Sequence, residues 1–323
     1  MSFLGIDLGT SGLRALLVDS GGRPIGATER HYPVSHPHSG WSEQDPADWI
    51  AGAEAVIAAL LRDHPAAMAR LQAIGLSGHM HGAVLLDASD RVLRPCILWN
   101  DGRSGPQCAE LTARADFHGI AGNLVMAGFT APKLLWVQQN EPQTFRAVAK
   151  VLLPKDYLRL WLTGAHVAEM SDAAGTSWLD TGARDWSDAL LAAGHMRRDQ
   201  MPRLVEGSAP AGQLRGDLAQ AWGLSHPVVV AGGAGDNAAA ACGIGAMAEG
   251  QGFVSLGTSG VLVAARDGYH PAPETALHTF CHAVPDTWYQ MGVMLSATDS
   301  LNWLSQITGA SPSDLTAPLG DDL

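Results

Sequence analysis

A carboxylate followed by glycines and hydroxyl residues stands near the start of the chain. Asp7 ends an apolar run and directly precedes the turn Leu8–Gly12, whose sequence is LGTSG. Backbone N–H groups in such a turn can approach phosphate oxygens closely, and the hydroxyls of Thr10 and Ser11 add donors. A carboxylate beside them can hold a magnesium ion. A purely structural hairpin turn explains the same residues, so this motif alone leaves both interpretations open.

The pentapeptide LGTSG occurs a second time, at Leu256–Gly260, and apolar runs flank both copies. An apolar run, a GTSG turn and a second apolar run form the pattern of a β-hairpin. The shared context favours an internal duplication over chance. We therefore expect two related domains, 1–245 and 246–323, with the boundary near Ala246–Gly250. The second is predicted to be incomplete, because the first has far more residues after its own hairpin.

A third glycine-rich segment, Ala231–Asn237, places a carboxylate beside a predicted helix. It follows the expected strand Val228–Val230 and precedes an alanine-rich helix that we place at Ala238–Ala241. The helix N-terminus favours the ionised form of Asp236. An aspartate here can be a simple N-cap. The three nearby glycines allow a ligand to approach closely, which favours a general base for a substrate hydroxyl.

Two histidines lie in the predicted loop Ser77–Gly82, whose sequence is SGHMHG. His79 and His81 could chelate a metal, but a His-x-His pair with no third ligand in motif spacing is a weak signal. A role for His81 in contacting a sugar is favoured, because its ring nitrogens can donate to or accept from hydroxyls.

Alternating helix and strand signals connect these segments. Asp45 and Pro46 are typical of a helix start, as N-cap and first helical residue. Such alternation predicts a mixed α/β sheet flanked by helices. The expected helices are Trp49–Leu61, Pro132–Asn140, Lys155–Leu162 and Ala297–Thr308, and the expected strands are Ala73–Leu76, Ala83–Asp87 and Trp288–Met291.

Composition narrows the classes of partner. The 323 residues are 46% hydrophobic and carry a net charge of −12 with only three lysines, so no basic stripe is available for nucleic acid or an anionic membrane. The segment Ala238–Ala248 is far shorter than the roughly 20 apolar residues of a membrane span. Four widely spaced cysteines predict reduced, unpaired thiols. We expect a cytoplasmic protein, and a homodimer stays open.

Together these features resemble the carbohydrate kinases of the FGGY family. The run Gly128–Asn140, GFTAPKLLWVQQN, fits the first family signature at every constrained position. Five further runs resemble the members that phosphorylate the ketopentose xylulose: WSEQDP at 41–46, MHG at 80–82, WNDGR at 99–103, LPKDYL at 153–158 and SDAAGT at 171–176. The resemblance implies the actin-like ATPase (ribonuclease H-like) fold, in duplicate with the second domain incomplete.

The resemblance also implies roles for individual residues, with ATP and Mg²⁺ as cofactors and xylulose as the sugar. Asp236 is expected as the general base, and Asp7 and Asp236 as the carboxylates near the metal. The residues expected around the ATP phosphates are Asp7, Gly9, Thr10, Ser11 and Arg14 in the first hairpin and Gly257 and Thr258 in the second. The residues expected around the sugar are Met80, His81, Trp99, Asp236 and Asn237.

Alternatives remain at this stage. One keeps the fold and changes the substrate to another ketose, a polyol or a sugar acid, such as ribulose, glycerol or gluconate. Another is a non-catalytic protein that binds sugar, because the adenosine-binding motif and second signature of the family are not found in the sequence. An ATPase without a sugar substrate would not need the motifs around Met80 and Trp99.

Overall fold

A computed structural model describes residues 1–257 and 259–320. Its larger sheet has seven strands in the order β13-β14-β5-β1-β2-β3, with β15 also paired to β5. β1 and β5 run parallel, whereas β1, β2 and β3 are antiparallel neighbours. The strands are β1 Ser2–Leu8, β2 Gly12–Asp19, β3 Pro24–His31, β5 Leu71–Gly78, β13 Pro210–Gln213, β14 Val229–Ala231 and β15 Ala234–Gly235.

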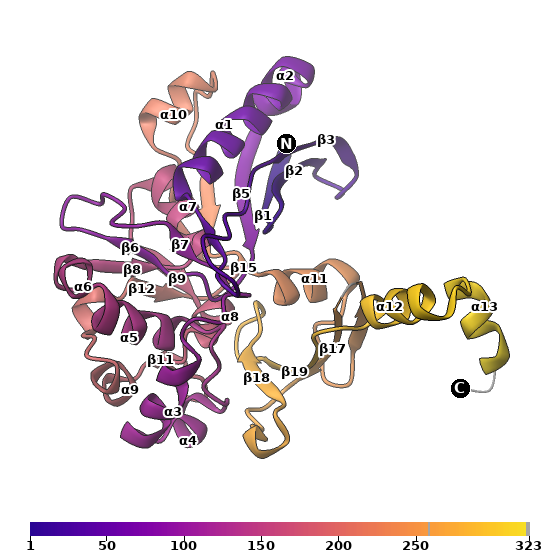
Figure 1. Ribbon diagram of the computed structural model, residues 1–323. Coiled ribbons are helices and arrows are strands. Elements are labelled where there is room, and N and C mark those ends of the chain that lie inside the picture. The colour runs from indigo at the N-terminus through magenta and orange to yellow at the C-terminus, as the bar shows by residue number, and fades with distance from the viewer. Residues whose placement is uncertain (258, 321–323) are drawn as a thin grey trace.

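Helices α1 (Pro46–Asp63) and α7 (Pro154–Thr163) contribute to the core on one face of this sheet (Figure 1). As predicted, Asp45 caps α1, because its carboxylate accepts from Ala47 N at 2.9 Å. The buried face of α1 packs with alternate residues of β1 and β2, the periodicity expected of a sheet with one covered face. These residues are Trp49, Ala53, Val56, Ile57 and Leu60 on the helix and Leu4, Ile6, Leu13, Ala15 and Leu17 on the strands.

The middle of the chain is mainly helical and has a second apolar core. Its helices are α3 Gly105–Arg114, α4 Phe117–Ala121, α5 Thr130–Asn140, α6 Pro142–Ala147, α8 Met170–Ala173 and α9 Asp188–Ala193, with 3₁₀ turns at Ala174–Thr176 and Arg198–Gln200. Helices α2 Pro65–Met68 and α10 Gly216–Ala221 pack instead with the core of the larger sheet. Short strand pairs join them: β4 Glu43–Gln44 with β7 Cys96–Ile97, β6 Val84–Leu86 with β8 Lys150–Leu152, β9 Val167–Glu169 with β12 Arg203–Val205, and β10 Leu179–Asp180 with β11 Asp185–Trp186.

A separate four-stranded antiparallel sheet follows α11 (Asp236–Ile244), in the order β16-β17-β19-β18. Its strands are β16 Gly252–Leu256, β17 Gly260–Arg266, β18 His278–Cys281 and β19 Trp288–Met294, with a 3₁₀ turn at Pro273–Thr275. Phe280 and Tyr289 join the apolar core of the helical region, so this sheet does not stand alone. Figure 1 shows α12 (Thr298–Thr308) and α13 (Pro312–Thr316) extending away from the rest of the molecule; the 3₁₀ turn Ala317–Leu319 follows.

Most predicted elements are confirmed, although many of their bounds shift by one to three residues, and three of the changes bear on the site. The loop predicted at Ser77–Gly82 is shorter, because β5 continues to Gly78 through pairing with β1 and β15. The helix predicted at Ala238–Ala241 runs from Asp236 to Ile244. The helix predicted from Pro132 begins at Thr130. None of the four cysteines forms a disulfide, and no described helix has both the length and the apolar character needed to cross a membrane.

Candidate active site

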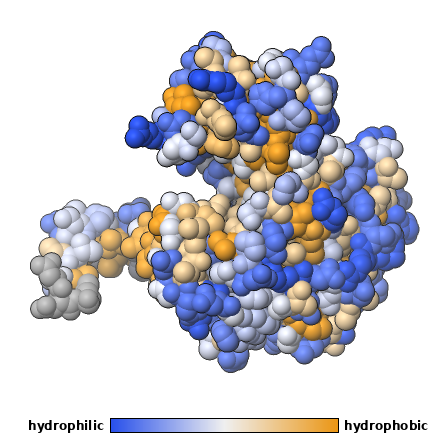
Figure 2. Space-filling view, turned by 180° about the vertical axis from the view of Figure 1, so that it is seen from behind, coloured by the Kyte–Doolittle hydropathy of each residue, from blue (hydrophilic) through white to orange (hydrophobic). Residues whose placement is uncertain are grey.

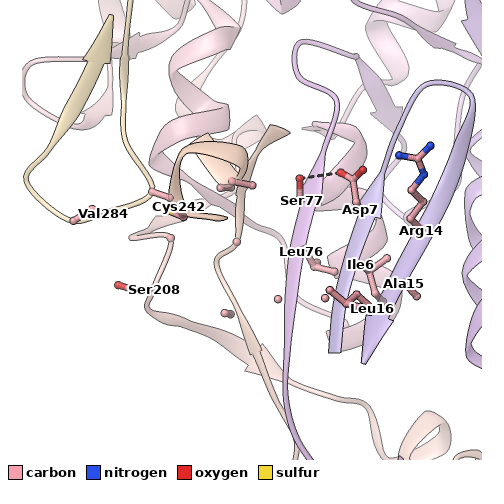
Figure 3. A pocket seen from close by; sticks show the side chains of 18 of the residues that line it. Ile6, Asp7, Arg14, Ala15, Leu16, Leu76, Ser77, Ser208, Cys242 and Val284 are labelled. Atoms are coloured by element: carbon pink, nitrogen blue, oxygen red, sulfur yellow. Dashed lines mark hydrogen bonds between the residues drawn. The ribbon is translucent and has the colours of Figure 1, made fainter. Parts of the chain in front are cut away.

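The sheet brings Asp7 and the segment before Asp236 to one edge. Strands β1, β5 and β15 are parallel neighbours, and their register pairs Asp7 with Ser77 and Ser77 with Ala234. Ser77 Oγ donates to Asp7 Oδ1 at 2.9 Å (Figure 3). Asp236 follows two residues after Ala234, at the first position of α11. Two carboxylates that are 229 positions apart in the sequence therefore approach the same end of the sheet.

The surroundings of Asp236 alter its acidity. Displacement of water by the surrounding protein, together with the nearby negative charge of Asp7, raises the pKa of Asp236 to about 6. Asn237 opposes this shift, because its N and Nδ2 donate to Asp236 Oδ1 at 2.7 and 2.9 Å. The residue remains exposed to solvent, so a ligand can reach the carboxylate. Gly235, not Asp236, occupies the N-cap position of α11.

Glycines and buried donors shape the segment that precedes Asp236. Gly233 has φ +74°, where a side chain would be strained and would meet the carbonyl of Leu76. Ser171 Oγ accepts from Gly235 N at 3.0 Å. Arg159 donates to the Gly232 carbonyl. The backbone that carries the carboxylate is thus held from beneath.

A cluster of five charged side chains, each fully buried, lies under this segment. Lys155 Nζ lies 2.7 Å from Asp156, 3.4 Å from Glu169 and 3.3 Å from Asp172. Arg159 pairs with Asp156 at 2.6 Å. Burial raises the pKa of Asp172 well above its ordinary value, despite Lys155 nearby. Removing one member would leave an uncompensated buried charge, so the cluster makes the backbone around Asp236 rigid.

Three of the predicted phosphate contacts lie in the first turn. Thr10 Oγ1 accepts from Trp99 Nε1 at 3.0 Å, which joins this turn to a residue predicted to contact the sugar. Ser11 is exposed and Gly9 is half-buried. Arg14 lies on β2 opposite Asp7 and forms an exposed ion pair with Glu29 at 3.2 Å.

The second turn is described in part. Gly257 N donates to Ser259 O at 2.9 Å, and its carbonyl accepts from Thr298 N at 3.0 Å. Thr298 is the first residue of α12, which therefore anchors the turn. The other predicted phosphate contact in this turn, Thr258, lies outside the described residues.

His81 is held in one tautomer. Its Nδ1 lies 2.7 Å from the Gly175 carbonyl, so that nitrogen carries the proton. Burial lowers the pKa of His81 to about 3, which leaves Nε2 as a neutral hydrogen-bond acceptor. The ring stacks on Phe129 with 4.5 Å between centroids, and Lys133 Nζ donates to the His81 carbonyl at 2.8 Å. His81 adopts φ 70°, a costly backbone conformation that these contacts maintain.

The remaining predicted sugar contacts differ in accessibility. Trp99 is 40% exposed, whereas Met80 is buried. Met80 packs so closely on Gly235 that a Cβ there would lie 2.9 Å from its Cγ. Met80 therefore places the loop of His81 directly against the segment of Asp236.

A large cavity adjoins Asp7. Its volume is about 1040 Å³, and Figure 2 shows apolar side chains along the hollow between the two parts of the molecule. Asp7 and Ser77 line it from the sheet, and Ser208 and Val284 lie on the opposite wall (Figure 3). Asp236 is not among its lining residues. The structure thus separates this cavity from the loop of His81.

Sequence reasoning missed the residues that hold these groups in place. They are Ser77, Lys133, Lys155, Arg159 and Ser171. One signal was available: the chain has only three lysines, and two of them, Lys133 and Lys155, are fully buried. Lysine is almost never fully buried without partners, so a rare lysine among apolar residues is a candidate positioning residue.

The sequence also matches a known protein family. The N-terminal domain of the FGGY family of carbohydrate kinases matches residues 2–243. The chain belongs to this family. The resemblance carried by Gly128–Asn140 and the LGTSG turn is thereby confirmed.

Individual relatives agree with the family. The chain is 52% identical to "Xylulose kinase" of Escherichia coli strain K12 over 310 residues, which cover 96% of this chain and 63% of the relative. A crystal structure of a "xyloylose kinase" from Brucella ovis superposes with a TM-score of 0.97 at 59% identity, covering all of this chain and 67% of the other. The xylulose kinase structure from Rhodospirillum rubrum gives 0.90 at 30% identity and covers all of this chain and 64% of the other.

These comparisons show the family and the fold. The protein has the actin-like α/β fold of the FGGY sugar kinases, as predicted. The chain spans about 63% of the length of the curated relatives that it matches at 52% and 51% identity.

Proposed function

We propose that the protein acts in the ATP-dependent phosphorylation of D-xylulose to D-xylulose 5-phosphate, a step of pentose catabolism. The observation that carries this proposal is the convergence of Asp7 and Asp236 on one edge of the sheet, with Met80 of the His81 loop packed against Gly235, next to Asp236. The relatives named xylulose kinase, at 52% and 51% identity, support xylulose over another sugar.

Asp236 is proposed as the general base. The sugar 5-hydroxyl loses its proton to Asp236 as its oxygen bonds to the γ-phosphorus, while the bond from that phosphorus to the bridging oxygen breaks and ADP leaves. A carboxylate with a pKa near 6 is ionised at neutral pH and is more basic than an ordinary aspartate. Asn237 occupies Oδ1, and no described residue donates to Oδ2. Oδ2 is the atom proposed to receive the proton.

The residues present fit magnesium and phosphate. Asp7 receives one described side-chain hydrogen bond, from Ser77 to Oδ1, so Oδ2 is available to the hard oxygen-seeking Mg²⁺. The metal would neutralise charge on the phosphates. We assign the turn of Gly9, Thr10 and Ser11 to the phosphates of ATP, with Arg14 and Gly257 near them. His81 Nε2 is proposed to accept from a sugar hydroxyl. The ring of Trp99, whose single N–H is given to Thr10 Oγ1, is proposed to pack against the sugar, with Met80 behind His81.

Two further assignments belong to the same proposal. The division into 1–245 and 246–323 is supported by the family match, which ends at 243, and by the second sheet, which begins at Gly252. A cytoplasmic location is supported by four cysteines that form no disulfide, as expected in a reducing compartment.

A coupled assay of ADP formation tests this function. We expect D-xylulose to stimulate ADP release more than ribulose, glycerol or gluconate at equal concentration. A stronger response to one of those three compounds would replace xylulose as the substrate.

Calorimetry separates the enzyme from a sugar-binding protein. Titrations with D-xylulose and with MgATP are expected to give saturable heat in each case. Binding of xylulose without any binding of ATP would instead support the non-catalytic alternative.

A further inference from the structure

The first LGTSG turn is held by three side chains that lie outside the hairpin turn. Each contacts a main-chain carbonyl, and the three carbonyls are consecutive. The contacts are Tyr32 Oη to Gly9 O at 2.6 Å, Gln44 Nε2 to Thr10 O at 2.6 Å, and His31 Nδ1 to Ser11 O at 3.1 Å. Two of these side chains, Tyr32 and Gln44, are shielded from solvent at least in part, so their contacts compete little with water.

The amide of Gln44 can take only one orientation. Trp49 Nε1, which is solely a donor, gives its hydrogen to Gln44 Oε1 at 3.1 Å. The Nε2 group must therefore face Thr10 O, and it also lies 3.3 Å from Pro33 O. Both Gln44 and Trp49 are buried, so α1 fixes the donor that the turn receives.

Tyr32 is likewise fixed as a donor. Burial, with a smaller contribution from the negative charge of Asp7, raises the pKa of Tyr32 above its ordinary value. Its hydroxyl stays protonated and gives its hydrogen to Gly9 O.

Planar trans peptide bonds convert these contacts into a direction for the amides. Within one peptide unit the C=O and the following N–H point opposite ways. Because the Gly9 carbonyl points toward Tyr32, the Thr10 N–H of the same peptide unit points away from Tyr32. Because the Thr10 carbonyl points toward Gln44, the Ser11 N–H points away from Gln44. Neither N–H has a hydrogen-bond partner among the described residues.

We propose that Gln44 and Tyr32 are positioning residues that orient the Thr10 and Ser11 amides to receive a phosphate group. The inference deepens the proposed function and rests on it, because it explains how this turn would hold phosphate. It explains how a protein with a net charge of −12 can bind the phosphates of ATP, because oriented backbone N–H groups replace a cluster of basic side chains. Trp99, through Thr10 Oγ1, extends the same turn toward the proposed sugar site.

The test uses magnesium tripolyphosphate and amide NMR on the whole chain. In the unsubstituted protein the Thr10 and Ser11 amide resonances should shift saturably as the probe is added. Tyr32→Phe removes one donor, and Gln44→Met removes the donor to Thr10 O together with the acceptor of Trp49 Nε1; both keep most of the packing volume. We expect each to weaken probe binding about tenfold, the size of one lost hydrogen bond. D-Xylulose binding, measured by calorimetry, should stay within about twofold.

Matched controls separate orientation from stability. Gln72→Met removes a similar side-chain donor at the far end of β5, where Gln72 donates to Arg70 O, and Tyr269→Phe removes a hydroxyl from the second sheet region. Both should bind the probe like the unsubstituted protein. If circular dichroism shows that Gln44→Met does not fold, Tyr32→Phe alone tests the proposal, because Tyr32 is only half-buried.

The outcomes are distinct. Unchanged probe binding in a folded Tyr32→Phe and Gln44→Met would overturn the positioning role and leave the proposed function standing. Absence of any shift at Thr10 and Ser11 in the unsubstituted chain would overturn the phosphate role of the turn, and the inference with it. Equal weakening of xylulose and probe binding would indicate general loosening and would also refute the positioning role.

Discussion

The hairpins at Leu8–Gly12 and Leu256–Gly260 have one turn sequence and two different surroundings. In each, a third antiparallel strand joins the second strand of the hairpin: β3 beside β2, and β19 beside β17. A helix follows each third strand, α1 in one case and α12 in the other. Only the first hairpin has a strand, β5, on its other edge; no described strand pairs with that edge of β16.

Exposure measures the difference. Leu8 is 0% exposed, whereas its counterpart Leu256 is 72% exposed. Trp49 of α1 is 0% exposed, and Trp303 of α12 is 62% exposed. Apolar side chains of this second region are visible at the surface in Figure 2. The pentapeptide therefore forms a hairpin locally in both places, whereas its burial depends on neighbouring elements.

The two turns share one hydrogen bond, from a side-chain hydroxyl to the carbonyl of the turn glycine. The carbonyl of Gly9 accepts from Tyr32, and the carbonyl of the matching Gly257 accepts from Thr298 Oγ1 at 2.6 Å. In both cases a residue after the third strand anchors the glycine of the turn. The first turn gains further anchors from His31 and Gln44.

The largest effect on turnover is expected from substitution of Asp236, the proposed general base. Asp236→Asn keeps the shape of the side chain and removes its basicity, so turnover of xylulose should fall about 10²- to 10⁴-fold with little loss of xylulose binding. Asp299→Asn, in the first turn of α12, is the matched control. Steady-state kinetics and calorimetry decide, and near-normal turnover of Asp236→Asn would remove its assigned role.

Matched truncations of the two hairpins test the difference in burial. Leu8→Ala should lower the free energy of unfolding by about 2–5 kcal/mol, because it empties space in a packed core. Leu256→Ala should change it by less than about 0.5 kcal/mol. Urea denaturation measures both. Equal costs would show that the second hairpin is as well supported as the first.

Ser171→Ala probes the support beneath Asp236. It leaves the Gly235 N–H without its hydroxyl acceptor, at a cost of about 1–3 kcal/mol in unfolding free energy. Ser300→Ala in exposed α12 serves as the control and should be close to neutral. Thermal unfolding followed by circular dichroism gives the comparison; a neutral Ser171→Ala would contradict the anchoring described for Gly235.

The smallest effect concerns the two carboxylates. Asp7→Asn removes the negative charge that helps to raise the pKa of Asp236, so that pKa should fall below about 6. Asp19→Asn, at the far end of the same hairpin, should leave it unchanged. Carboxyl NMR titration measures both, and an unshifted Asp236 in Asp7→Asn would place the two groups too far apart to interact.

The raised pKa of Asp236 predicts how turnover and stability depend on pH. Below about pH 6 Asp236 takes up a proton and can no longer accept one from a sugar, so turnover should fall as the pH is lowered through that value. The contribution of Asp236 to the stability of the folded state changes in the opposite direction with pH. A carboxyl whose folded-state pKa exceeds its unfolded value favours the folded state below pH 3.8, and this contribution is lost as the pH rises through about 6.

Local signals were enough for much of the fold. Asp45 and Pro46 start α1, and Gly164 ends α7 in the left-handed conformation. Both hairpin turns also follow from their own residues, because capping and tight turns depend on neighbours in the sequence. Strand ends were less predictable: Ser77 and Gly78 belong to β5 only because β1 and β15 pair with them.

Local residue patterns were sufficient to predict the turns, the cap of α1, the family and the types of residue available for chemistry. The positions of those residues relative to one another depend on the folded chain. Tertiary structure alone set Asp7 beside Ser77, gave Asp236 its raised pKa, buried Lys155 among carboxylates and aimed Gln44 at Thr10. The physical reason is that hydrogen bonds, desolvation and charge interactions act over a few ångströms in space, and the groups concerned are far apart along the chain.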